Sequence, residues 1–263
     1  MKSTFDGMAA DYDREFSHTF LGGLLRKRVW RHIDQHFQAN DHILELNCGT
    51  GEDAIHLIKR GVNVHATDVS NNMLQVVKKK ADGLHSQQNP SKAQLSYEQV
   101  DINKLDQWQC NIKFDGVISN FGGLNCVADL TEVAEQLHRL CKPEAKIIVC
   151  IMGPFLPWEW LWFCCRGEFK KAFRRLTPGG VRWRDATIYY PSQRQVKHSF
   201  ANFFNLQSCF GLGALVPPPY TEEWACKHPR LIKKLDRWEQ ACETMFPLRW
   251  LADHYVMTFV NKP

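Results

Sequence analysis

The sequence predicts an α/β protein built on a doubly wound, mostly parallel sheet. Short β-rich runs alternate with helical segments from residue 42 onward, a glycine-rich turn follows the first run, and acidic or amide residues end successive runs. Such alternation is typical of βαβ units, whose crossover connections make neighbouring strands parallel. With 263 residues, 44% of them hydrophobic, the chain can bury one sizeable core, so we expect a single domain.

Seven strands and several helices are expected, in an order that supports this fold. Before the first strand, residues 21–37 have the apolar spacing of an amphipathic helix, and Ser70 is placed to cap the helix after the second strand. Two further helices are expected near 194–204 and over 222–245. The strands are expected over residues 42–46, 62–67, 95–100, 114–119, 146–152, 206–215 and 254–260.

The regular spacing breaks after the fifth strand, where a segment rich in tryptophan, arginine and phenylalanine intervenes. We therefore expect insertions after strands five and six to form an aromatic-rich cap on the single domain, 1–263. We expect an N-terminal helical cap over residues 1–40 and a ligand-binding core over 41–152. The inserted cap is expected over 153–193, and the C-terminal part of the sheet with a helical insertion over 194–263.

The composition excludes several classes of protein. A formal charge of +5 is too small to indicate a nucleic-acid partner. Ten cysteines form no C-x-x-C pair and no Cys/His spacing, which predicts reduced thiols and no metal site. No signal peptide is recognised, and no apolar run approaches the roughly 18–20 residues of a membrane span, so we expect a cytoplasmic protein without an integral membrane segment. The oligomeric state stays open.

The segment LELNCGTGEDA, residues 44–54, reads as a strand, a tight glycine turn and the start of a helix. Gly49 and Gly51 let the backbone turn sharply and lie close to a ligand. Together with Ala54 they also satisfy the dinucleotide pattern G-x-G-x-x-G/A, so an NAD-linked oxidoreductase is an alternative. The charges favour another ligand, because a diphosphate at a helix start would be repelled by the nearby carboxylates, which a cation would tolerate: Glu45, Glu52 and Asp53.

Further polar residues end the next three strands. Asp68 follows Glu45 by 23 residues and can accept hydrogen bonds from both hydroxyls of a ribose. Asp101 ends the third strand in YEQVDINKL, and Asn120 ends the fourth in FDGVISNFGGLN. Ligands of open α/β sheets bind at these carboxyl ends, so we expect the three side chains to border one pocket.

From about residue 5 to 150 the chain resembles the class I S-adenosylmethionine-dependent methyltransferases. The resemblance begins with FDGMAADYD and ends with RLCKPEAKIIV. It implies S-adenosyl-L-methionine as cofactor and small-molecule methylation as activity. It also implies that Tyr12 closes over the cofactor. By the same resemblance, the methionine end of the cofactor is bordered by Glu45, Asn47 and Gly49, and the ribose is bordered by Asp68. Asp101 would border the adenine, and Asn120 with Phe121 would form the floor of the cofactor site. The neighbouring positions complete the implied site: Cys48, Gly51, Val69, Met73 and Ile102.

Two positions depart from the family pattern. Asn47 stands where the family commonly has the first glycine of G-x-G-x-G, and the family's Pro-Gly-Gly turn before the fifth strand is replaced by residues 143–145, Pro-Glu-Ala. Because asparagine tolerates left-handed backbone angles better than most residues, we expect the turn at Asn47 to survive.

The aromatic residues of 153–190 and 217–250 are expected to cover the pocket and to bind a small, partly apolar or aromatic acceptor, for O- or N-methylation. Residues 161–176 also show the pattern of a basic amphipathic helix, with Leu161 and Leu176 on its apolar face. An alternative is therefore a lipid or isoprenoid-quinone acceptor at a membrane surface, with peripheral membrane contact. A non-catalytic cofactor-binding protein is a further alternative.

Methyl transfer from a sulfonium needs alignment above all, and a base when the acceptor must lose a proton. His254, in LADHYVMTF at the start of the last strand, is one candidate base, and His18, beside Thr19 in the N-terminal cap, is the other.

Overall fold

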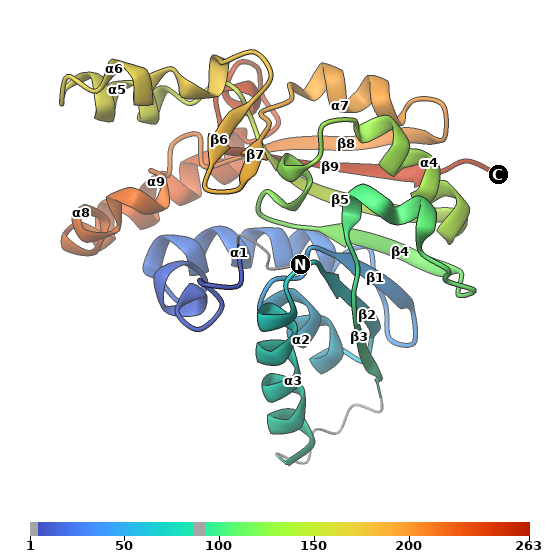
Figure 1. Ribbon diagram of the computed structural model, residues 1–263. Coiled ribbons are helices and arrows are strands. Elements are labelled where there is room, and N and C mark those ends of the chain that lie inside the picture. Colours follow the sequence, from blue (N-terminus) through green and yellow to red (C-terminus); the bar gives the residue numbers. More distant parts are fainter. Residues whose placement is uncertain (1–4, 87–92) are drawn as a thin grey trace.

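The computed structural model describes residues 5–86 and 93–263, and it confirms the α/β fold. One sheet of seven strands has the order β3-β2-β1-β4-β5-β9-β8 (Figure 1). Six strands lie close to the predicted ranges: β1 (His42–Leu46), β2 (Asn63–Asp68), β3 (Leu95–Gln99), β4 (Phe114–Ser119), β8 (Phe204–Leu212) and β9 (His254–Asn261). β5 (Cys141–Met152) begins five residues before the predicted start at 146, so residues 143–145, expected to form a turn before the strand, lie within it.

The pairing of the strands determines which residues meet at one edge. β1 pairs in parallel with β2 and β4, β2 with β3, and β4 with β5, so these five strands end at the same edge. β9 runs antiparallel to β5 and begins where β5 ends, with His254 opposite Met152. The start of the last strand therefore lies at the edge where open α/β sheets bind ligands.

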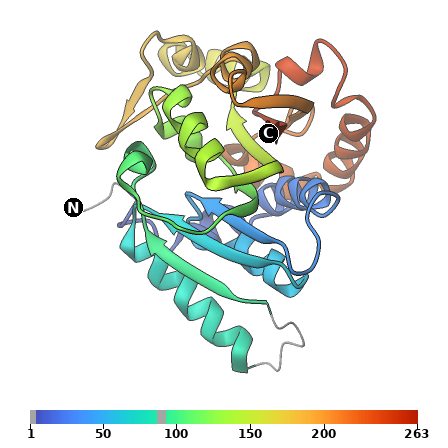
Figure 2. The ribbon, with the colours of Figure 1, turned by 90° about the vertical axis from the view of Figure 1, so that its right-hand side faces the viewer.

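Helices cover both faces of the sheet, as the continuous apolar runs of its strands require. One buried cluster joins the sheet to α1 (Phe20–Ile33), α2 (Glu52–Lys59) and α3 (Asn71–Ser86), and the other joins it to α4 (Leu130–Leu140) and α7 (Gln193–Phe200). Figure 2 shows α3 and α4 on opposite sides of the twisted sheet. Each fully buried leucine or phenylalanine contributes roughly 1.5–3 kcal/mol to this arrangement.

The segment between β5 and α7 departs from the predicted continuous helix over 161–176. It forms α5 (Pro157–Cys164), α6 (Phe169–Ala172) and a short 3-10 turn, followed by a hairpin of β6 (Val181–Trp183) and β7 (Ala186–Ile188) that was not predicted. Gly167 adopts φ +72°, which ends a helix, so the apolar spacing spans a break.

Near the C-terminus, the single helix predicted over 222–245 is also wrong. The structure has α8 (Glu222–Lys227) and α9 (Pro229–Cys242). His228 separates them with φ −126° and ψ 47°, because the residue before a proline is disfavoured from helical angles.

The N-terminal segment lies across the carboxyl edge of the sheet. Phe5 contacts the ring of Trp183 in the β6–β7 hairpin at 5.7 Å between centroids. Asp6 accepts a hydrogen bond from the hydroxyl of Ser70, and its carbonyl accepts one from Asn72. These contacts connect the N-terminal segment to both the core and the hairpin.

Candidate active site

A cavity of about 130 Å³ lies at the carboxyl edge of the sheet. Its walls come from the N-terminal segment and from the residues that follow β1, β2, β3 and β4. Ten of the thirteen residues expected around the cofactor line it: Tyr12, Asn47, Gly49, Asp68, Val69, Met73, Asp101, Ile102, Asn120 and Phe121.

The glycine turn after β1 adopts left-handed backbone angles. Asn47, Gly49 and Gly51 have φ values of +52°, +54° and +77°. The prediction that asparagine can replace the family's first glycine is therefore confirmed for the backbone. Gly51 does not line the cavity, but a Cβ at this position would lie 2.9 Å from Cγ2 of Val77, so the turn packs directly on α3.

Asp68 organises the same turn from the end of β2. Its carboxylate accepts hydrogen bonds from the backbone N–H of Gly49 at 2.9 Å and of Ser70 at 2.8 Å. Burial raises the pKa of this carboxyl, although both hydrogen bonds oppose the shift. A carboxylate has about four lone-pair positions, so two remain for a ligand in the cavity.

Three buried oxygen atoms beside the turn have no hydrogen-bond partner. They are Oε2 of Glu45, Oδ1 of Asn47 and Oδ1 of Asn120. A buried acceptor without a partner costs about 1–3 kcal/mol, so such a group is expected to have a ligand as its partner. The two amide oxygens accept hydrogen bonds, and the oxygen of Glu45 does so when its carboxyl is ionised, so together they suit a ligand that carries N–H donors and positive charge.

Glu45 adds to this preference for a cation, although neither it nor Cys48 lines the cavity. Burial raises the pKa of its carboxyl well above the usual value, and the negative charge of Asp53 raises it further. A cationic ligand nearby would favour the ionised form.

The other two carboxylates of the turn correct the charge argument made from the sequence. Asp53 bonds to Arg26 and to Nε1 of Trp30, both at 2.6 Å, and Glu52 bonds to Lys80. Because these cations neutralise them, the expected repulsion of a diphosphate by Glu52 and Asp53 is wrong. The preference for a cationic ligand over a diphosphate rests instead on two features. One is the carboxylate of Glu45, and the other is the N–H of Gly49, which already donates to Asp68 and is not available to a phosphate.

Aromatic rings surround Phe121, which lines the cavity. Phe121 follows β4 with φ +48°, a strained value for a residue with a side chain. Its ring contacts Phe16 at 5.4 Å and His254 at 5.7 Å, and the guanidinium of Arg26 lies 4.6 Å from its centroid. Burial raises the pKa of Tyr12.

His254 is one ring away from the cavity. Its Nδ1 lies 3.3 Å from Oδ2 of Asp253, and both residues are buried. Burial alone would raise the pKa of Asp253, but the adjacent charges of His254 and Arg175 hold it well below its usual value. Asp253 therefore stays ionised and lies beside the imidazole of His254.

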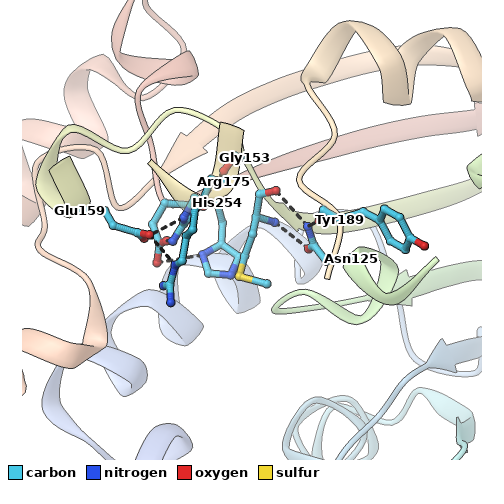
Figure 3. Close-up of polar contacts among 9 residues, drawn as sticks. Asn125, Gly153, Glu159, Arg175, Tyr189 and His254 are labelled. Atoms are coloured by element: carbon cyan, nitrogen blue, oxygen red, sulfur yellow. Dashed lines mark hydrogen bonds and ion pairs between the residues drawn. The ribbon is translucent and has the colours of Figure 1, made fainter. Parts of the chain in front are cut away.

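Arg175 connects this pair to α5, in the segment between β5 and α7 (Figure 3). Its guanidinium donates to Oδ1 of Asp253 at 2.6 Å and to Oε2 of Glu159 at 2.8 Å. It also donates to the backbone carbonyls of Gly153 and Asp253. Glu159 comes from α5, so one buried arginine joins α5 to the start of β9.

Asn125 makes a second connection at this edge. Its Nδ2 donates to the carbonyls of Met152 and Tyr189 at 3.0 and 2.6 Å, and its Oδ1 accepts from the N–H of Met152 (Figure 3). The loop after β4, the end of β5 and the segment after β7 are therefore held together by one amide.

His18, the other candidate base, lies elsewhere. Its side chain is 61% exposed and its Nε2 is 3.4 Å from Glu52. With Asp13 and Glu52 it forms a group that could hold a metal ion, but Nζ of Lys80 already lies 2.6 Å from Asp13 and bonds to Glu52. His18 does not line the cavity.

Five lining residues were not predicted: Phe5, Asn103, Gly122, Gly123 and Cys126. The two glycines had a signal, since they follow the fourth strand in SNFGG. Gly122 has φ +87°, and a Cβ at Gly123 would lie 2.6 Å from Cβ of Asn47, so the loops after β1 and β4 touch here. Arg26, which bonds to Asp53 and lies over the ring of Phe121, was also not predicted, because no motif in the sequence marks it.

The sequence of this chain is similar to those of known methyltransferases. A family model described as a methyltransferase domain matches residues 43–144. The chain is 28% identical to a demethylmenaquinone methyltransferase of Leptospira interrogans, over 60% of this chain and 64% of that protein. It is 29% identical to a 2-phytyl-1,4-naphtoquinone methyltransferase of Nostoc sp., over 57% of this chain and 63% of that protein.

Among solved structures, phosphoethanolamine N-methyltransferase 2 of Haemonchus contortus, in complex with S-adenosyl-L-methionine, has the same fold. The TM-score is 0.61 at 17% identity, and the match covers 98% of this chain and 57% of that one. The chain is therefore similar to methyltransferases in sequence, and it shares the fold of a methyltransferase that binds S-adenosyl-L-methionine. It spans a little under two thirds of the length of the two quinone methyltransferases. The methyltransferase fold explains why the carboxyl ends of β1 to β4 share one cavity.

Proposed function

We propose that this protein transfers a methyl group from S-adenosylmethionine to a small, partly apolar acceptor with an aromatic or quinone-like ring. The observation that carries the proposal is the set of unpartnered acceptor oxygens of Glu45, Asn47 and Asn120 beside Asp68 and the glycine turn. They match a ligand with an ammonium group at one end and a ribose at the other. The relatives named for naphthoquinone substrates support the acceptor class.

The residues of the cavity divide the binding of this cofactor. Glu45, Asn47 and Asn120 would accept hydrogen bonds from its ammonium group, Asp68 from the ribose hydroxyls, and Asp101 would lie at the adenine. The bound cofactor supplies an electrophilic methyl group. Tyr12 and Phe5 line the open side of the cavity, where they would exclude water.

His254 is the proposed base for an acceptor that must lose a proton. Asp253 faces Nδ1, so the opposite ring nitrogen, Nε2, is the one that would take the proton, and the carboxylate would stabilise the resulting imidazolium. A quinol hydroxyl is such an acceptor. We assign His18 no part in this step because its side chain is exposed and pairs with Glu52.

Calorimetry with S-adenosylhomocysteine and with NADH tests the cofactor. Binding of the first and not of the second is expected, and the Glu45→Gln variant is expected to bind S-adenosylhomocysteine more weakly, because it loses the negative charge beside the ammonium group. Binding of NADH alone would overturn the proposal. Incubation with labelled S-adenosylmethionine and a prenylated naphthoquinol then tests the acceptor class, for which labelled product is expected.

The base is tested by a pair of matched variants. His254→Gln is expected to lower kcat about 10²–10⁴-fold, the usual contribution of a general base, while leaving S-adenosylhomocysteine affinity unchanged. His18→Gln is expected to leave kcat unchanged. The opposite result, with kcat lost in His18→Gln and kept in His254→Gln, would refute the assignment.

A further inference from the structure

In helix α5 the charged residue is buried, whereas an apolar residue is exposed to solvent. Its sequence, PWEWLWFC, is apolar except for Glu159. Of its eight residues, all of which the structure describes, Glu159 is the one that is buried, whereas Leu161 is 60% exposed. The carboxylate is buried because Arg174 and Arg175 both bond to it. A helix this apolar is normally covered on all sides, so its outer side lacks a covering partner within the described chain.

The residues after α5 add further exposed apolar side chains. Phe169, Phe173 and Leu176 are 61%, 46% and 44% exposed, far more than is usual for such side chains. They accompany exposed lysines on α6, at the end of the molecule opposite β3 (Figure 1). We name this surface the cap face and define it by six residues: Leu161, Phe169, Lys170, Lys171, Phe173 and Leu176.

Positive charge is concentrated around the cap face. Residues 153–190 contain seven lysines and arginines against three acidic residues. Arg175 is buried with Glu159 and Asp253, and Lys171 pairs with Glu168, so the cations without a carboxylate partner in this segment are fewer. Several of these cations lie against aromatic rings. The guanidinium of Arg166 is 3.6 Å from the ring centroid of Trp162, and Nζ of Lys171 is 5.8 Å from that of Phe163.

We infer that the cap face docks on the surface of an anionic lipid bilayer. Exposed phenylalanine and leucine side chains can enter the boundary between headgroups and acyl chains, while lysines beside them extend to the phosphates. A protein partner fits less well, because lysine is depleted from the centres of protein interfaces. In residues 5–86 and 93–263 the structure contains no helix that could span a membrane.

The side of α5 that faces the rest of the protein connects the cap face to the proposed catalytic residues. Trp162 and Phe163 contact the ring of Tyr220 at 6.0 and 5.4 Å, and Glu159 connects through Arg175 to the Asp253–His254 pair. Docking through the outer side would bring an apolar acceptor dissolved in the bilayer beside these aromatic rings. Only this role in acceptor delivery rests on the proposed function; binding to the bilayer itself does not.

Sedimentation with vesicles tests the inference. The full chain is expected to bind vesicles of phosphatidylcholine with phosphatidylglycerol and to bind pure phosphatidylcholine vesicles much more weakly. The double variant Leu161→Ser/Phe169→Ser should lose at least about tenfold in affinity, since each apolar side chain no longer leaves water. The control is Tyr97→Ser, which removes an exposed ring from β3 and should change nothing.

Charge is tested in the same way. Lys170→Glu/Lys171→Glu should weaken binding to the anionic vesicles by about fivefold for each positive charge lost. Lys78→Glu/Lys79→Glu, which makes the same change in net charge on exposed positions of α3, should have a much smaller effect. Equal losses in the two double variants would show attraction by net charge alone and would overturn docking through the cap face.

Two other results would also overturn the inference. One is that the wild-type chain does not bind the anionic vesicles. The other is that it forms dimers in analytical ultracentrifugation that Leu161→Ser/Phe169→Ser dissociates, which would make the cap face an interface between copies. S-adenosylhomocysteine binding, measured on the same samples, distinguishes these failures from failure of the proposed function, because the cap face lies outside the cofactor cavity.

Discussion

Arg175 offers the most demanding test of the structure, because its neighbour Arg174 serves as a matched control. Both arginines bond to Glu159. The side chain of Arg175 is 6% exposed and also pairs with Asp253, whereas that of Arg174 is 37% exposed and has no second carboxylate partner among the described residues. Substitution of each by methionine preserves much of the side-chain volume and removes the charge.

The expected magnitudes differ severalfold. In Arg175→Met, the buried Asp253 keeps only His254, and the buried Glu159 keeps only the half-exposed Arg174. Removing one partner of a buried ion pair costs about 3–5 kcal/mol, whereas an exposed pair contributes about 0–1 kcal/mol. For a domain of about this size, 1 kcal/mol corresponds to roughly 2–4 °C in Tm. We expect Tm to fall by roughly 6–20 °C in Arg175→Met and by at most about 4 °C in Arg174→Met.

Urea denaturation followed by circular dichroism, together with calorimetric melting, measures both variants. The double variant Arg175→Met/Asp253→Asn should recover part of the lost free energy of unfolding, because it removes the unpaired buried charge. If Arg175→Met costs no more than Arg174→Met, the buried network does not stabilise the cap on β9, and the reasoning is refuted.

Three further predictions concern the glycine turn, acid stability and the thiols. Gly51→Ala places a side chain at φ +77° and against α3, and should weaken S-adenosylhomocysteine binding in calorimetry and cost at least about 1–2 kcal/mol of stability, whereas Gly7→Ala, which meets no atom within 4 Å, should do neither. Burial lowers the pKa of His32 from its usual 6.5 to about 4, so the unfolded chain binds this proton first and the free energy of unfolding should fall as the pH drops through that window. Urea titrations at several pH values should show a smaller fall in His32→Gln, and an unchanged fall would contradict the assignment. Burial raises the pKa of Cys150 to about 12, so mass spectrometry should find it unmodified by iodoacetamide while the exposed Cys165 reacts; early labelling of Cys150 would contradict its burial.

The sequence was informative wherever a short stretch of chain determines the outcome. The ranges of β1 and β4 were predicted to the residue, because apolar runs bounded by turn residues define a strand locally. The left-handed angle at Asn47 was predictable for the same reason, since it depends on the residue's own conformational preference. The meeting of Asp68, Asp101 and Asn120 at one cavity followed from the rule that parallel strands end at one edge.

Tertiary structure alone decided which charges meet. Asp53 and Glu52 looked like free carboxylates at a helix start, but Arg26 and Lys80, both 27 or more residues away in the chain, neutralise them. The cap followed the same rule: its apolar spacing predicted one helix, yet Gly167 breaks it. The physical reason is range, because backbone preference and hydrophobic period act over a few residues, whereas the partner of a buried charge depends on how distant elements pack.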